Sequence, residues 1–143
     1  MDEIRMEVNI IPTKATHQSS LRIMRKKNGQ MFVGKFAKSA VKTWIQEFNW
    51  KIKPFKPVKP LDGPLELQLH FRFPFNKTTP KKYLNKDEWK TTRPDLDNME
   101  KMILDSLTSE GFIVDDSLIC LKTTSKKHSS NHGINIVVRQ IAP

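Results

Sequence analysis

The segment Leu65 to Phe73 alternates strictly between apolar and polar residues, and this limits the fold more than any other feature of the chain. The polar positions are Glu66, Gln68, His70 and Arg72, and every position between them is leucine or phenylalanine. Because successive side chains of a strand point to opposite faces, the pattern predicts a strand with one buried face. Such a strand needs a sheet around it and further elements to cover the apolar side.

Two segments have helical spacing. Ala40, Trp44 and Phe48 recur every four residues and predict a helix over residues 35–49. A second helix is predicted over residues 96–107, where Leu96, Met99, Ile103 and Leu107 fall on one side. Between these helices, the four prolines of residues 51–64 predict an extended connector before the alternating strand.

The remaining strands are shorter. Residues 8–11 are expected to open a strand, and residues 21–25 and 30–33 to form a hairpin around Asn28-Gly29, a typical hairpin turn. Residues 112–114 are expected to form a short strand, and residues 118–124 and 133–141 a closing strand pair. The order predicts a single α+β domain over residues 1–143, a mixed sheet packed with two main helices.

Composition narrows the class of protein. Hydrophobic residues make up 37% and charged residues 28% of the 143 residues, which favours a soluble globular domain without a membrane span. The N-terminal residues lack the pattern of a signal peptide. The one cysteine, Cys120, excludes an internal disulfide, so a cytoplasmic location is expected, with Cys120 as a small core residue.

The charge is distributed unevenly. The net charge is +10, yet residues 95–116 hold seven acidic residues against one lysine. The rest of the chain holds 24 basic and 8 acidic residues. Crowded carboxylates repel each other, and a bound divalent cation relieves that repulsion. A basic body around an acidic site is typical of a metal-dependent nuclease.

The second helix is predicted to present its charged side away from the core. Asp97, Lys101 and Asp105 lie opposite the apolar stripe, and Lys101 is placed to bridge the two carboxylates. With Asp95 at the helix entrance and Asp116 after the short strand, we expect the carboxylates to converge. Such a cluster could hold Mg²⁺, which prefers oxygen ligands and would orient a water against a phosphate.

Each acidic residue also has an ordinary structural interpretation. Asp95 or Asp97 could cap the helix N-terminus, where aspartate is favoured. The pair Asp115-Asp116 alone is typical of a turn. Lys101 and Asp105 alone would be an ordinary surface pair.

The whole motif is more specific than its parts. It runs from Arg93-Pro94-Asp95-Leu96-Asp97-Asn98 through Lys101 and Asp105, and continues in Gly111-Phe112-Ile113-Val114-Asp115-Asp116. This motif closely resembles that of the RusA family of Holliday-junction resolvases, which occur in bacteria and are often encoded by phages or prophages. The family signature is Pro-Asp-x-Asp-Asn, a lysine three residues later, an aspartate four residues further, and then an Asp-Asp pair.

The resemblance implies the roles of individual residues. It assigns Asp95, Asp97 and Asp116 to the catalytic metal-binding positions and Lys101 to the functional lysine. Asn98, Asp105 and Asp115 match supporting positions. The implied cofactor is Mg²⁺, with Mn²⁺ as a substitute. The implied activity is paired, symmetric nicking of four-way DNA junctions by a homodimer, in DNA recombination and repair.

The basic residues outside the motif are expected to bind the phosphates of branched DNA. These residues are Lys14, Arg22, Arg25, Lys26, Lys27, Lys77, Lys81, Lys82, Lys86, Lys90, Arg93, Lys126 and Lys127. Tyr83 and Trp89 lie in a basic loop predicted over residues 74–93, where they could stack on unpaired bases or fasten the loop.

Three other functions remain open at this stage. One is a basic DNA-binding module of phage recombination without catalysis. Another is a metal-dependent nuclease acting on other branched or single-stranded nucleic acid. The third is a structural protein whose acidic cluster binds calcium.

Overall fold

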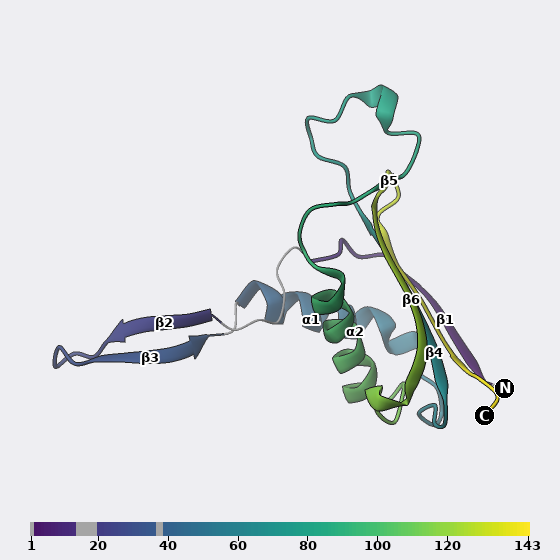
Figure 1. Cartoon of the computed structure of the whole chain (residues 1–143), viewed down its shortest axis with the longest axis horizontal. Coiled ribbons are helices and arrows are strands. Elements are labelled where there is room, and N and C mark those ends of the chain that lie inside the picture. Colours follow the sequence, from purple (N-terminus) through teal and green to yellow (C-terminus); the bar gives the residue numbers. More distant parts are fainter. Residues whose placement is uncertain (1, 14–19, 37–38) are drawn as a thin grey trace.

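The computed structural model describes residues 2–13, 20–36 and 39–143. In this part of the chain, five strands form a mixed sheet in the order β1-β7-β4-β6-β5, and β2 and β3 form a separate hairpin (Figure 1). The elements in chain order are β1 Glu3–Val8, β2 Ser20–Arg25, β3 Met31–Phe36, α1 Ser39–Ile52, the 3₁₀ turn η1 Lys53–Phe55, β4 Leu65–Phe73, η2 Lys81–Tyr83, β5 Glu88–Trp89, α2 Leu96–Ser109, η3 Asp116–Leu118, β6 Ile119–His128 and β7 Gly133–Gln140. The α+β class with two main helices is therefore confirmed.

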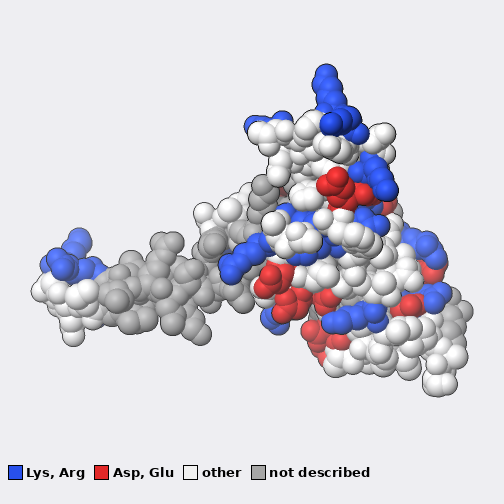
Figure 2. Space-filling view, turned by 45° about the horizontal axis from the view of Figure 1, so that its top comes forward, with Lys and Arg blue, Asp and Glu red and all other residues white. Residues whose placement is uncertain are grey.

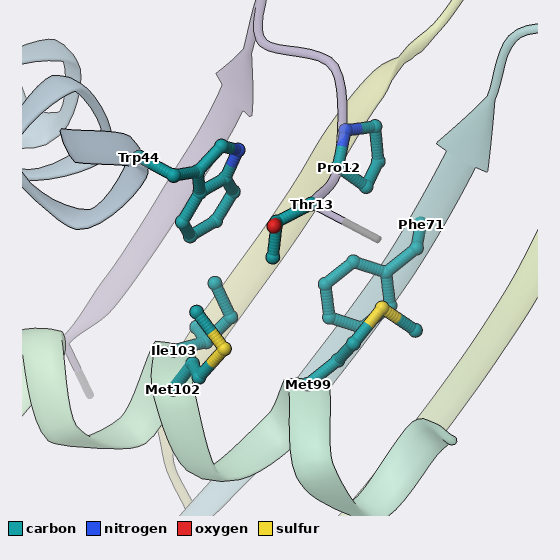
Figure 3. A pocket seen from close by; sticks show the side chains of 7 residues that line it. All are labelled: Pro12, Thr13, Trp44, Phe71, Met99, Met102 and Ile103. Carbon is teal, nitrogen blue, oxygen red and sulfur yellow. The ribbon is translucent and has the colours of Figure 1, made fainter. Parts of the chain in front are cut away.

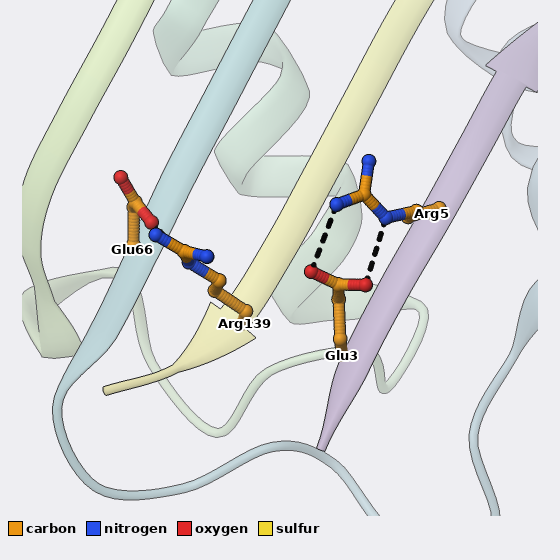
Figure 4. A network of polar contacts seen from close by, with 4 residues as sticks. All are labelled: Glu3, Arg5, Glu66 and Arg139. Carbon is orange, nitrogen blue, oxygen red and sulfur yellow. Dashed lines mark hydrogen bonds and ion pairs between the residues drawn. The ribbon is translucent and has the colours of Figure 1, made fainter. Parts of the chain in front are cut away.

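The alternating segment is the central strand of the sheet. β4 has the predicted bounds, pairs antiparallel with β7 and parallel with β6, and buries every one of its leucines and phenylalanines. The other side of the sheet is polar and is crossed by ion pairs. Figure 4 shows Glu3 with Arg5 and Glu66 with Arg139 on this side.

The two helices cover the apolar face of the sheet (Figure 1). Phe48 and Ile52 of α1 and Met99, Ile103 and Leu107 of α2 join the core formed by the inward residues of β1, β4 and β7. At one end, Pro12, Trp44 and α2 enclose an apolar crevice that is too narrow to admit water (Figure 3). Trp44 stacks on Phe48 and donates its indole N–H to the carbonyl oxygen of Ile11 at 2.8 Å, so this crevice is a packing seam.

The prediction for the first helix was wrong at both ends. Lys35 and Phe36 belong to β3, and α1 begins at Ser39 and continues to Ile52. Pro54 does not interrupt it, because this proline lies in the first turn of η1, where its missing N–H has no helical partner to lose. The N-terminal strand also lies earlier than expected, since β1 ends at Val8 instead of beginning there.

The predicted closing strand pair was wrong in its pairing. β6 and β7 both form, but β4 lies between them. Lys126 and Lys127 therefore belong to β6 and not to a connecting loop. Residues 112–114 form no strand, and only Ile113 makes an isolated bridge, with Leu61.

Two smaller expectations have clear outcomes. The hairpin forms as predicted, and its turn uses Gly29 at a φ of 87°, a conformation that glycine adopts without strain. Cys120 is exposed at the edge of the sheet, so the expectation of a core cysteine was wrong. No helix among the described residues is long and apolar enough to span a membrane.

Replacing Leu69 by alanine tests the core. The side chain is fully buried at the centre of β4, so the expected loss is about 2–5 kcal/mol of unfolding free energy, from lost transfer energy and a residual cavity. The neighbouring Gln68 faces the polar side, and Gln68→Ala should cost less than about 1 kcal/mol. Urea denaturation measures the unfolding free energy of both variants. Equal losses would contradict the assignment of Leu69 to the apolar face and of Gln68 to the polar face.

Candidate active site

Two carboxylates lie at the N-terminus of α2. Asp95 is the N-cap residue by position, with φ −73° and ψ 144°, and its carbonyl accepts the N–H of Met99 at 3.2 Å. Its exposed side chain makes no capping hydrogen bond, and Asp97 is exposed in the first helical turn. The structure therefore does not support the interpretation of Asp95 as a side-chain cap. Both carboxylates face solvent at the positive end of the helix dipole.

The charged side of α2 is oriented as the helical spacing predicts. Lys101 is exposed, and Asn98 and Asp105 are half-buried. The expected bridge was wrong, because Lys101 forms no ion pair with a described residue. Its ammonium group is therefore available one helical turn from Asp97.

Sequence reasoning missed the role of Glu100. This residue was counted with the acidic cluster, but it is buried, and its Oε2 accepts a hydrogen bond from Nζ of Lys122 in β6 at 2.8 Å. The contact fastens the middle of α2 to β6. The only sequence signal was its position next to Met99 at the border of the apolar stripe.

The second acidic pair lies at η3. Asp115 is the N-cap of this turn, and its Oδ2 accepts hydrogen bonds from the backbone N–H of Ser117, at 3.2 Å, and from the Ser117 hydroxyl. The Ser117 hydroxyl and then its N–H lower the pKa of Asp115. Asp115 thus has the structural role of a turn residue. Asp116 follows it, with an exposed side chain.

The two acidic pairs lie at opposite ends of α2. The Lys126 ammonium group donates to the carbonyl oxygens of Thr92 and Pro94 at 2.8 Å, so the helix begins beside the end of β6. The N–H of Phe112 bonds the carbonyl oxygen of Leu107 at 2.9 Å, so the chain leaves the other end of the helix towards η3.

Two estimates of the distance between Asp95 and Asp116 agree. From Asp95 to Leu107 the helix rises about 18 Å, at roughly 1.5 Å per residue. From Ile119 to Lys126, β6 covers about 23 Å, at roughly 3.3 Å per residue. Asp116 precedes Ile119, so it lies on the order of 20 Å from Asp95 within one chain.

The expectation that these carboxylates converge within one chain was therefore wrong. Mg²⁺ binds its ligand oxygens at about 2.1 Å, so ligands of a shared ion must lie within a few ångströms of each other. Among the described residues, no three histidine, cysteine, aspartate or glutamate side chains are grouped closely enough to hold a metal. Carboxylate oxygens are suitable ligands for a hard cation such as Mg²⁺. Within a single chain, however, Asp116 lies too far from Asp95 and Asp97 for the three to bind one ion.

Exposed basic side chains project on two sides of the surface that carries α2. Figure 2 shows blue at the tip of the β2–β3 hairpin and on the loop that carries η2, with red gathered on the body between them. The exposed members of the predicted DNA-binding set are Arg25, Lys26, Lys27, Lys77, Lys81, Lys82, Lys86 and Arg93.

Three predicted DNA-binding lysines are already engaged within the fold. Lys90 is buried, with its ammonium group 2.9 Å from the Thr92 hydroxyl and over the ring of Phe73. Lys126 ties β6 to the start of α2, and Lys127 lies over the ring of Trp89, 4.3 Å from its centroid. Lys14 lies outside the described residues, and for Arg22 the structure describes the strand but not the side chain.

The two aromatic residues of the basic loop are both exposed. Trp89 is 69% exposed beside Lys127, and Tyr83 is 49% exposed with the Lys82 ammonium group 5.0 Å from its ring centroid. Each ring thus offers an open face next to a cation, an arrangement able to stack a nucleobase and neutralise its phosphate.

The comparison with protein families agrees with this combination of acidic helix and basic surroundings. The family model of the endodeoxyribonuclease RusA matches residues 11–139. The chain therefore belongs to the RusA endodeoxyribonuclease family, as the sequence motif predicted. Comparison with curated proteins found no match.

Family membership identifies the chain as an endodeoxyribonuclease, of a family that acts on branched DNA and generally depends on a divalent metal. The match includes both acidic pairs, the α2 helix and the basic loop.

Proposed function

We propose that this protein resolves four-way DNA junctions by paired, symmetric nicks that depend on Mg²⁺, with Mn²⁺ as a substitute. The observation that carries the proposal is the family match over residues 11–139, together with two exposed aspartates at the α2 N-terminus that are not used for capping. Asp95, Asp97 and the partner subunit's Asp116 are the proposed metal ligands, because a single chain does not bring the three carboxylates together. Lys101 is the proposed electrostatic partner of the scissile phosphate.

The surroundings of α2 suit a branched polyanion. The basic hairpin tip and the basic loop are separate projections, and red patches lie with some blue on the body between them (Figure 2). The exposed carboxylates of Asp95 and Asp97 would repel DNA phosphates there unless a cation were bound. DNA would therefore be held by its phosphates on the basic sides, and the acidic residues would hold a cation that stabilises charge at one scissile phosphate.

Four-way junctions have approximate two-fold symmetry, and so does a homodimer. We propose a C2 homodimer whose two sites cut strands of like polarity in matching positions. The products would be nicked duplexes that a ligase can seal. The proposed biological setting is recombination and repair, including the processing of phage DNA.

A panel of substrates tests this function. Purified protein is incubated with a labelled four-way junction, a linear duplex, a single strand and an RNA of matched length, each with Mg²⁺, Mn²⁺ or EDTA. We expect rapid cleavage of the junction alone and none in EDTA. Equal cleavage of the linear duplex or of RNA would contradict junction specificity, and binding without cleavage would contradict the nuclease assignment.

The basic loop provides a quantitative prediction. Replacing exposed Lys81 and Lys82 by alanine should weaken junction binding and lower the slope of log K against log salt by up to about 2, one unit for each lost phosphate contact. Lys53→Ala combined with Lys59→Ala removes the same charge from exposed positions outside this loop and is the matched control. Titrations at several salt concentrations measure both slopes. Unchanged affinity and slope in the loop variant would remove this loop from the DNA surface.

A further inference from the structure

Trp89 places a large apolar ring on the surface of the basic loop. This residue is 69% exposed in β5, the short strand at the edge of the sheet (Figure 1). Tryptophan side chains that pack against their own fold are largely buried. Trp89 therefore contributes little to the core, and its ring is available to a ligand.

The neighbours of Trp89 fix the direction in which its ring points. Trp89 lies opposite Lys127 in the pairing of β5 with β6. The next residue, Lys90, is buried, and its N–H bonds the carbonyl oxygen of Lys126 at 3.2 Å while its ammonium group lies over the ring of Phe73. Because successive side chains of a strand point to opposite faces, a buried Lys90 directs Trp89 outward. Lys90 therefore fastens this end of the loop, and the indole ring is held in place for a partner.

The exposed ring lies next to positive charge. The Lys127 ammonium group is 4.3 Å from the centroid of the Trp89 ring, so it covers one face and leaves the other to solvent. Residues 74–93 hold six basic side chains against Asp87 and Glu88. Tyr83 in the same loop repeats the combination, with its ring 5.0 Å from the Lys82 ammonium group. Such a surface favours an anion that also has a flat apolar face.

An unpaired nucleotide of DNA has both properties. Its base has a π-face that stacks on aromatic side chains, and its phosphate pairs with lysine. The bases of a continuous duplex are already stacked on each other, so their flat faces are closed to the ring. An acidic peptide would pair with the lysines but offers no planar group to the indole ring.

We propose that Trp89 and Lys127 form a stacking site for an unpaired nucleobase of DNA, separate from the acidic residues of α2. The neighbouring Lys126 contacts the carbonyl oxygen of Pro94, directly before Asp95. By strand alternation, Lys127 and Trp89 lie at this same end of α2 but on the opposite side of β6. A strand opened near Asp95 would meet the ring by passing the edge of the sheet at β5. The inference rests on the proposed function, which supplies DNA whose bases lose their stacking neighbours at the crossover.

Tryptophan fluorescence tests the stacking directly. The chain has three tryptophans, and Trp44 is half-buried with its N–H bonded to Ile11. A Trp50→Phe background therefore leaves Trp89 as the exposed indole. Titration with an oligothymidylate of about 10 nucleotides, in EDTA, should quench its fluorescence strongly. Adding Trp89→Phe should remove the quenching. Absence of binding by anisotropy, or binding without quenching, would overturn the proposal.

Affinity and its salt dependence separate stacking from charge. Trp89→Ala should weaken binding of the oligonucleotide roughly 5- to 150-fold, the equivalent of the ~1–3 kcal/mol that one stacked base contributes. The slope of log K against log salt should stay unchanged, because a stacked ring releases no counterions, whereas Lys127→Met should lower it by about 0.7. Trp89→Phe keeps an aromatic ring and should recover most of the affinity. Wild-type affinity of Trp89→Ala, or a loss that Trp89→Phe does not recover, would contradict stacking.

A comparison of substrates shows whether the ring selects unpaired bases. In EDTA, Trp89→Ala should weaken binding of the four-way junction and of the oligonucleotide but not of a linear duplex. Trp50 is 73% exposed in α1, outside the basic loop, so Trp50→Ala is the matched control and should leave all three affinities unchanged. An equal loss for the duplex would mean that the ring contacts paired DNA, and the proposed ligand would be wrong.

These outcomes are separable from the failure of the proposed function, because none of them requires cleavage or a cation. If the wild type resolves junctions but Trp89→Ala binds every substrate normally, only the stacking site is wrong. If the wild type cleaves no junction while the oligonucleotide quenches Trp89, only the resolvase function is wrong.

Discussion

Asp97→Asn is expected to abolish junction cleavage while junction binding persists. The substitution keeps the size of the side chain but replaces an anionic oxygen ligand with a neutral amide, which binds hard cations weakly. The expected fall in the single-turnover rate with Mg²⁺ is on the order of 1,000-fold or more, by analogy with the loss of a principal transition-state contact. Removing a negative charge next to bound DNA should leave affinity unchanged or slightly higher.

Folding and charge controls accompany this variant. Asp97 is exposed in the first turn of α2, so the lost dipole interaction should change the unfolding free energy by less than about 1 kcal/mol. Asp87→Asn makes the same chemical change at an exposed position in the basic loop and should cleave at the wild-type rate. Wild-type cleavage by Asp97→Asn would remove this residue from the site.

Lys101→Ala is expected to slow cleavage about 100-fold, with less than a threefold change in junction affinity. Its ammonium group lies one helical turn after Asp97 and pairs with no described acidic group, so it is available to a phosphate that gains charge during cleavage. A group that acts mainly in the transition state lowers the rate more than the binding.

The conservative variant separates the possible roles of Lys101. Lys101→Arg keeps the positive charge and should recover part of the lost rate. Single-turnover kinetics and equilibrium binding, measured on the same junction, give the two parameters. If Lys101→Ala weakens binding and leaves the rate at saturating protein unchanged, this lysine is a phosphate anchor.

Local sequence patterns correctly predicted the elements that are determined by residues close together in the sequence. The alternation of β4, the apolar stripe of α2 and the Asn28-Gly29 turn each depend on neighbouring residues, and each forms where the sequence indicates. Cys120 was misplaced because a short apolar stretch looks the same in a central strand and at an open edge. The pairing of β6 with β4 is a contact between distant segments, which no local pattern encodes.

The site could be predicted in its residues but not in its geometry. The motif identified both acidic pairs, and the family match covers them. Their separation depends on the direction of β6 relative to α2, which Glu100–Lys122 and Lys126–Pro94 establish in three dimensions. Lys126 and Lys127 were placed in a connecting loop for the same reason. The structure places both in β6, where Lys126 contacts the carbonyl oxygens of Thr92 and Pro94.

The most direct test of the central claim is the position of the nicks on a four-way junction. Each of the four strands is labelled in turn at its 5′ end, and the products are resolved with Mg²⁺ present or chelated. The account predicts cuts at symmetric positions in two opposed strands, with ligatable ends and no cuts without the cation. Unrelated cuts in all four strands, or an intact junction in Mg²⁺ and in Mn²⁺, would contradict it.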